Sequence, residues 1–103
     1  MNTYDKDGPI SCETVVGFVE GRVSAHHIPE EIISDISVSL RRDGDSFAQA
    51  SRFVRIDEPF YFIVEPGSYS LECHFDQVKL NTPVFAVGPS ERKVIQFRFM
   101  NEQ

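Results

Sequence analysis

The chain has 103 residues, 41% of them hydrophobic and 12% aromatic, which is the size and composition of one domain with a single core. The formal net charge is -6 and no more than two Lys or Arg residues are adjacent, so the sequence lacks the basic surface that binding nucleic acid requires. It has no apolar run of about 18 residues and no basic start followed by an apolar stretch, so we expect no membrane insertion of this segment and no signal peptide in it.

The first segment, residues 1–12, combines Gly8 and Pro9 with polar neighbours, and it is predicted to be a flexible lead-in. From Glu13 onward the pattern changes to the alternation of strands, so residues 13–103 are predicted to be the folded domain.

The opening strand places apolar residues at alternate positions. Val15, Val19 and Val23 are predicted to fill the core on one side. Gly17 and Gly21 fall on the same side, and glycine there indicates a bulge or the close approach of another backbone.

Val16 and Phe18 face the other way on this strand. One face of a sandwich strand is inner, so these two residues require a cover: the lead-in, the loop Ala25–Glu31 or another protein. Val16 and Phe18 are therefore the candidate protein-contact residues.

The loop Ala25–Glu31 interrupts the alternation, and Pro29 favours a short helical turn after it. Alternation returns over Ile36–Leu40, which is predicted to be a strand with one buried face. Asp43 and Gly44 then predict a tight reversal.

Two further strands are predicted over Phe53–Asp57 and Phe60–Val64, and the second is apolar enough to be buried on both faces. The segment Glu65–Ser68 contains Pro66 and Gly67, the sequence of a type II turn with a positive φ at the glycine. We expect this turn to join two antiparallel neighbours.

The remaining strands follow the same alternation. Their apolar residues are, in order, Tyr69, Leu71, Cys73 and Phe75, then Val84 to Val87, then Ile95, Phe97 and Phe99. About seven short strands without helical spacing predict an all-β fold, an antiparallel β-sandwich of the prealbumin-like or immunoglobulin-like kind. The last strand should hold the C-terminal end in a sheet.

Three segments together carry a family resemblance: residues 17–23 (GFVEGRV), 36–40 (ISVSL) and 60–71 (FYFIVEPGSYSL). In this order they resemble the transthyretin-like, or carboxypeptidase regulatory-like, β-sandwich family. The resemblance implies a non-catalytic module that acts in a larger assembly, commonly in an extracytoplasmic or lumenal space. One enzyme branch of that fold, the hydroxyisourate hydrolases, ends in Tyr-Arg-Gly-Ser; this sequence lacks the tetrapeptide, so no catalytic residue is carried over.

Few residues suggest chemistry. His26 and His27 lie near two carboxylates, Glu30 and Glu31, and these are suitable metal ligands, but a solvated loop explains them as well. His74 would join them only if its strand ended beside the loop. We expect no metal and no cofactor.

The two cysteines are Cys12 and Cys73. They lack the spacing of a zinc site, and they could form a disulfide in an oxidising compartment. The alternative is that Cys73 is a buried apolar residue and Cys12 a free thiol.

The leading hypothesis is a non-catalytic module that acts through protein-protein contact, either with a protein partner or by self-association through an edge strand. Three alternatives stay open. They are a small metal-dependent or hydrolytic enzyme centred on His26 and His27, an acidic inhibitor that blocks a basic site by charge, and a carbohydrate-binding module using Tyr4, Tyr61 or Tyr69.

Overall fold

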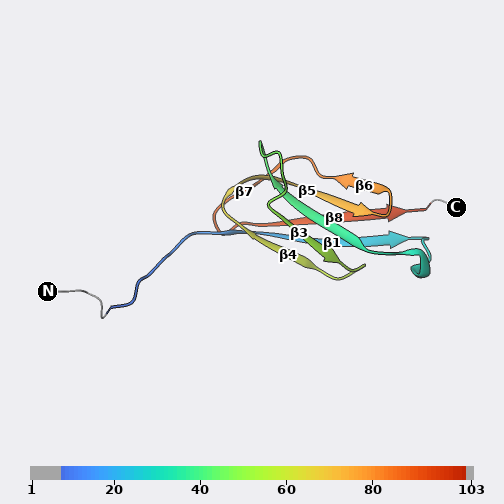
Figure 1. Cartoon of the computed structure of the whole chain (residues 1–103), viewed down its shortest axis with the longest axis horizontal. Coiled ribbons are helices and arrows are strands. Elements are labelled where there is room, and N and C mark those ends of the chain that lie inside the picture. Colours follow the sequence, from blue (N-terminus) through green and yellow to red (C-terminus); the bar gives the residue numbers. More distant parts are fainter. Residues whose placement is uncertain (1–7, 102–103) are drawn as a thin grey trace.

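The computed structural model describes residues 8–101, which form two facing β-sheets (Figure 1). The elements are β1 (Gly17–His26), the 3-10 turn η2 (Glu30–Ile32), β2 (Ile36–Arg42), β3 (Ala50–Val54), β4 (Phe60–Val64), β5 (Gly67–Phe75), β6 (Val78–Asn81), β7 (Phe85–Val87) and β8 (Arg92–Met100). The small sheet has the strand order β4-β1-β8, and the large sheet has the order β3-β2-β5-β6 with β7 also paired to β5. The predicted all-β sandwich is confirmed, with eight strands in place of about seven.

One pairing in the small sheet differs from the antiparallel prediction. β1 and β8 run parallel, in a register from Phe18 beside Arg92 to His26 beside Met100. β1 pairs antiparallel with β4 on its other side, and every strand pair of the large sheet is antiparallel. The parallel pair places β1 at the centre of its sheet and leaves β8 at an edge.

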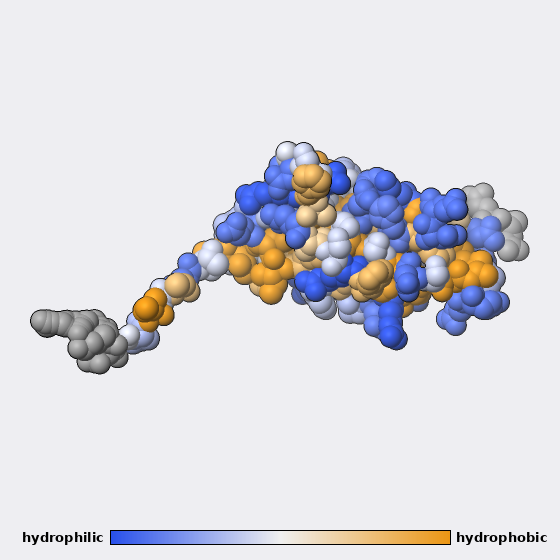
Figure 2. Space-filling view, in the orientation of Figure 1, coloured by the Kyte–Doolittle hydropathy of each residue, from blue (hydrophilic) through white to orange (hydrophobic). Residues whose placement is uncertain are grey.

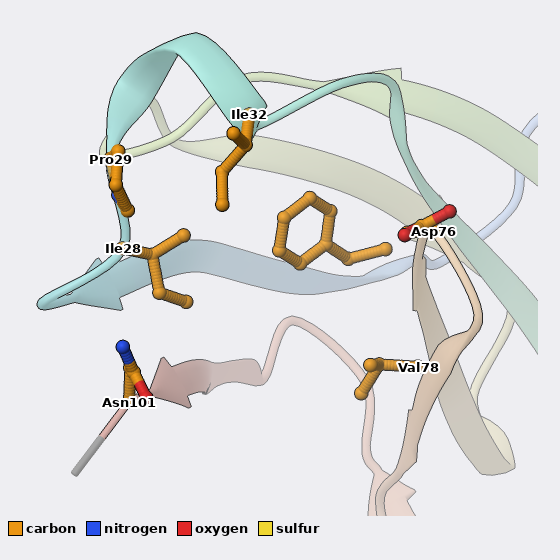
Figure 3. A pocket seen from close by; sticks show the side chains of 7 residues that line it. Ile28, Pro29, Ile32, Asp76, Val78 and Asn101 are labelled. Carbon is orange, nitrogen blue, oxygen red and sulfur yellow. The ribbon is translucent and has the colours of Figure 1, made fainter.

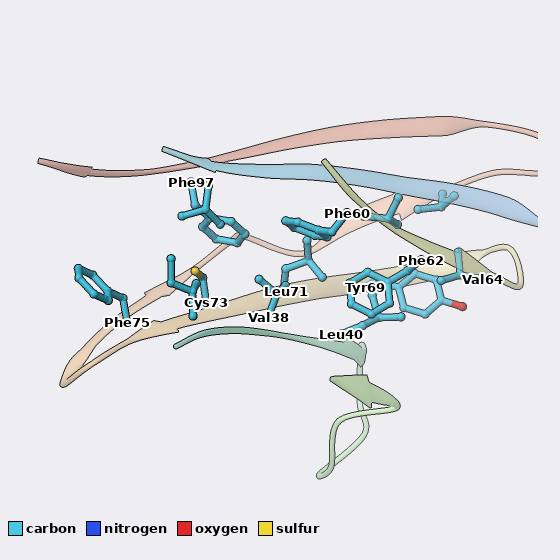
Figure 4. Packing of buried hydrophobic residues seen from close by; sticks show 14 of the residues in the cluster. Val38, Leu40, Phe60, Phe62, Val64, Tyr69, Leu71, Cys73, Phe75 and Phe97 are labelled. Atoms are coloured by element: carbon cyan, nitrogen blue, oxygen red, sulfur yellow. The ribbon is translucent and has the colours of Figure 1, made fainter. Parts of the chain in front are cut away.

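The core lies between the two sheets and is built from alternate residues of both (Figure 4). Its buried members include Val19, Val23, Val38, Leu40, Phe62, Val64, Tyr69, Leu71, Cys73, Val87, Phe97 and Phe99. Val15 does not belong to it: this residue precedes the first strand and is 55% exposed, so the prediction for Val15 was wrong.

The two glycines of β1 make room for neighbours, as their inward position predicted. A Cβ added at Gly21 would overlap the ring of Phe60, its register partner on β4. A Cβ added at Gly17 would overlap Val87 and come within 2.9 Å of the Gly88 carbonyl oxygen. The close approach is therefore by backbone at Gly17 and by an aromatic ring at Gly21.

The Pro-Gly segment is not a hairpin turn. β4 belongs to the small sheet and β5 to the large one, so Glu65 and Pro66 carry the chain across the sandwich. Among the described glycines only Gly44 has a positive φ, so the type II turn predicted at Gly67 was wrong. The reversal at Gly44 is confirmed, since the Asp45 amide donates to the Arg42 carbonyl at 3.0 Å.

Other predictions differ in detail. β4 has the predicted bounds, but only its inner face is buried, with Tyr61 and Ile63 exposed. The strand predicted over residues 53–57 was wrong in its bounds, since β3 spans Ala50–Val54 and overlaps it only at Phe53 and Val54. The helical turn after Pro29 is confirmed as η2.

β6 was not predicted, because it follows a two-residue turn, Asp76 and Gln77, that carries no glycine. Within residues 8–101 no helix is long and apolar enough to cross a membrane.

Candidate functional site

The outer face of the small sheet carries exposed apolar side chains on all three strands, which we call the outer patch. Register places six residues in two rows across the sheet: Ile63, Phe18 and Arg92 in one row, Tyr61, Glu20 and Val94 in the next. The exposed fractions of the apolar members are 39% for Phe18, 52% for Tyr61 and 69% for both Ile63 and Val94. The patch arises because β4 and β8 place apolar residues on both of their faces.

The patch contains one ion pair and one hollow. Glu20 and Arg92 pair across the two rows, and the hydrogen bond to Glu20 raises the pKa of Arg92. Beside them a hollow of about 390 Å³ is lined by Phe18, Tyr61, Arg92 and Ser90. The two aromatic rings can hold an apolar side chain of a partner, and the Glu20–Arg92 ion pair beside them can make polar contacts with it.

Of the two predicted contact residues, Phe18 lies within the patch and Val16 lies at its margin. Val16 is half-buried, and its carbonyl accepts a hydrogen bond of 2.8 Å from the Ser90 amide. Residues 8–15 are exposed, and the described part of the lead-in runs away from the sandwich (Figure 1). The described part of the lead-in therefore does not cover Phe18.

The segment predicted as the loop Ala25–Glu31 does not cover Phe18 either. Its first two residues, Ala25 and His26, end β1, and the rest lies at the opposite end of that strand from Phe18. There it lines a second, mostly apolar hollow of about 320 Å³, whose lining includes Ile28, Ile32, Phe75 and Val78. Ile28 and Ile32 lie across this hollow from Val78 (Figure 3). We call this hollow the end cavity. Apolar surface is visible both where the lead-in joins the sandwich and at the far end (Figure 2).

The histidines do not form a metal centre in the described structure. His26 ends β1, and His27 follows it with a φ of 60° and an exposed side chain. His74 bonds instead to Glu72 on the outer face of the large sheet. No group of three or more His, Cys, Asp or Glu residues within residues 8–101 is arranged to hold a metal ion.

The cysteines are unbonded to each other. Cys73 is buried in the core, where desolvation raises the pKa of its thiol to about 11, and Cys12 is exposed in the lead-in. A thiol with that pKa carries almost no thiolate at neutral pH and is a poor nucleophile.

The tyrosines have different environments. Tyr69 is buried, and its hydroxyl donates to the Glu65 carbonyl at 2.6 Å, which ties the crossing segment to the large sheet. Tyr61 belongs to the outer patch, and Tyr4 lies outside the described residues.

No family model matches the chain, and no curated protein matches it. The transthyretin-like resemblance therefore stays a prediction, and function has to be argued from the geometry.

Proposed function

We propose that this domain is a non-catalytic contact module that binds another protein surface through the outer patch. The observation that carries the proposal is the placement of Phe18, Tyr61, Ile63 and Val94 in two neighbouring rows of one outer sheet face, around the Glu20–Arg92 ion pair, with nothing of residues 8–101 covering them.

The area of exposed apolar surface supports this proposal. The exposed parts of the four side chains add up to roughly 400 Å² of mostly apolar surface, in the range of the largest, often functional, patch on a monomer. A standard interface covers about 800 Å² per partner, so the contact has to extend to the polar rim. The Glu20–Arg92 ion pair lies within the patch and supplies hydrogen-bonding groups there.

The alternatives have less support. The enzyme hypothesis requires His26 and His27 to act with further groups, and the described part of the chain brings no third ligand to them. Sugar binding requires exposed flat rings, and of the described tyrosines only Tyr61 offers one. No specific feature of the fold favours the acidic inhibitor.

The test is a pair of matched substitutions. Phe18→Asp places a charge in the patch, while Ser51→Asp places the same charge at an exposed site on the outer face of the large sheet. We expect both variants to stay folded in thermal unfolding, and only Phe18→Asp to weaken self-association in sedimentation or partner capture in a pull-down at least tenfold. Equal behaviour of the two variants would remove the patch as the contact surface.

A further inference from the structure

β8 is the longest edge strand of the sandwich. It has nine residues and no proline, whereas β3 and β4 have five, β6 has four and β7 has three. β4 is also flanked by Pro59 and Pro66. Short length and proline protect edges from adding a further strand, so β8 is the least protected edge.

The hydrogen bonds at its two ends show which groups of β8 are free. The Glu91 carbonyl accepts from the Phe18 amide at 2.8 Å, and the Asn101 amide donates to the His26 carbonyl at 3.0 Å. Odd-numbered residues therefore point their backbone groups at β1. Even-numbered residues point theirs at the open edge, where no backbone group of residues 8–101 meets them.

The side chains of β8 argue against pairing two β8 strands together. The strand contains Arg92, Lys93 and Arg98 and no acidic residue, although the chain as a whole is acidic. Arg92 and Lys93 have carboxylate partners, Glu20 and Glu91, but Arg98 has no ion pair within residues 8–101. Two β8 strands side by side would bring these cations together, whereas a strand with one acid opposite Arg98 would complete the edge.

The segment Ile10–Val15, which begins in the lead-in and belongs to no strand of the described structure, has the sequence of such a strand. From Ile10 to Val15 it has no proline and no glycine, and its single charge is Glu13. Ile10 is 94% exposed and Val15 is 55% exposed, so both gain from being covered.

We propose that the segment Ile10–Val15 of a second copy adds to the open edge of β8 as a parallel strand. With Glu13 beside Arg98, parallel pairing places Ile10 beside Ile95 and Val15 beside Met100. Apolar residues then lie beside apolar residues, and opposite charges lie beside each other. Antiparallel pairing about the same ion pair would instead place Val15 beside Gln96. This inference rests on the proposed contact function, but it uses the β8 edge and not the outer patch.

The same chain cannot make this pairing with itself. The Val16 carbonyl is bonded to the Ser90 amide at the start of β8, whereas the proposed register puts Val15 beside Met100 at the other end. A strand of nine residues separates those points by about 30 Å. The donor is therefore another molecule, and each copy both gives and receives a strand.

Because donor and acceptor surfaces differ, repeating the contact from copy to copy gives a head-to-tail ring or filament, and two copies that exchange strands give a closed dimer. The donor's β1 begins just past Met100, on the end of the sandwich that carries the end cavity with Ile28 and Phe75. The next copy is thus placed against apolar surface at that end.

The first experiment is a charge exchange in the full chain, read by sedimentation velocity over a range of concentrations. We expect the unaltered chain to form species whose mass rises with concentration. Glu13→Arg and Arg98→Glu should each weaken association at least tenfold, and the two together should restore it. Arg22→Glu, on the same face but on the central strand β1, is the control and should leave association unchanged.

The second experiment tests the register by mixing two variants that each carry one exposed cysteine, in a Cys12→Ser background that keeps the buried Cys73. Glu13→Cys mixed with Arg98→Cys should form an intermolecular disulfide more readily than either alone, while Glu13→Cys mixed with Arg22→Cys should not. A chain that stays monomeric, a double variant without recovery, or equal cross-linking in both mixtures would overturn the inference. If the chain is monomeric and the Phe18→Asp effect on a partner persists, the strand addition fails while the proposed contact function stands.

Discussion

The outer faces of the two sheets differ in chemistry although both sheets bury the same kind of core. On the large sheet the outer face is mostly polar: Ser39 and Ser51 share a hydrogen bond of 2.8 Å, and Glu72 contacts His74 and Lys79. Phe53, beside Ser37 on the edge strand β3, is the one large apolar side chain exposed there among the described residues. On the small sheet the corresponding positions form the apolar outer patch. The core does not require these outer apolar residues, and the difference between the two faces is what the proposed contact through the outer patch would require.

The largest expected difference between the two sheets is the loss of stability when one inner-face glycine of each sheet is replaced by alanine. Gly21→Ala in the small sheet forces the Phe60 ring aside, and we expect a loss of about 1 to 3 kcal/mol in urea unfolding. Gly67→Ala in the large sheet meets only the mobile end of Arg42, whose Nη2 would lie 2.9 Å from the new Cβ, so a loss below about 0.5 kcal/mol is expected. Equal losses would mean that the packing at Phe60 is looser than described.

A smaller effect is expected where the crossing segment is tied to the large sheet. Tyr69→Phe removes the hydroxyl that donates to the Glu65 carbonyl and should cost about 1 kcal/mol, again measured by urea unfolding. The control is Tyr61→Phe. The Tyr61 ring is exposed, so we expect this change to leave the free energy of unfolding unaltered. A loss at Tyr61 as large as that at Tyr69 would contradict the assignment.

The smallest effect concerns charge on the polar face. The hydrogen bond from His74, together with Lys79, lowers the pKa of Glu72 from its ordinary value of 4.5. A carboxyl whose pKa is lower in the folded state stabilises the fold above its ordinary pKa, and this contribution disappears as the pH falls through the folded value. Between about pH 5.5 and pH 3 the unaltered chain should therefore lose more stability than Glu72→Gln, by less than about 1 kcal/mol. If the free energy of unfolding falls equally with pH in the two proteins, the Glu72–His74 pair contributes nothing to stability.

Local patterns predicted most strands because alternation and turn residues are visible along the chain. The bounds of β4 and the burial of Tyr69, Leu71 and Cys73 followed from parity alone. β6 was missed because its preceding turn begins with Asp76, which adopts a φ of 56° without the glycine that usually marks such a turn.

What could not be predicted is which strands pair. The parallel contact of β1 with β8 joins residues such as Glu20 and Arg92, which are 72 positions apart, and nothing local indicates it. For the same reason the sequence placed Phe18 on an outer face but could not show that Tyr61, Ile63 and Val94 lie around it. Alternation along one strand shows which of its residues share a face. The strand order is needed to know which residues of other strands lie beside them.

The parallel pairing of β1 with β8 also affects the order in which the strands can pair as the chain folds. The large sheet pairs β2 with β3 and β5 with β6 across short loops, and such contacts form early. The small sheet keeps its central strand without its parallel partner until β8 has left the ribosome, and closing so long a loop slows folding toward the millisecond-to-second range. During that interval one whole side of β1 is an open edge, so a nascent chain is most exposed to wrong pairing at the strand that the finished fold protects best.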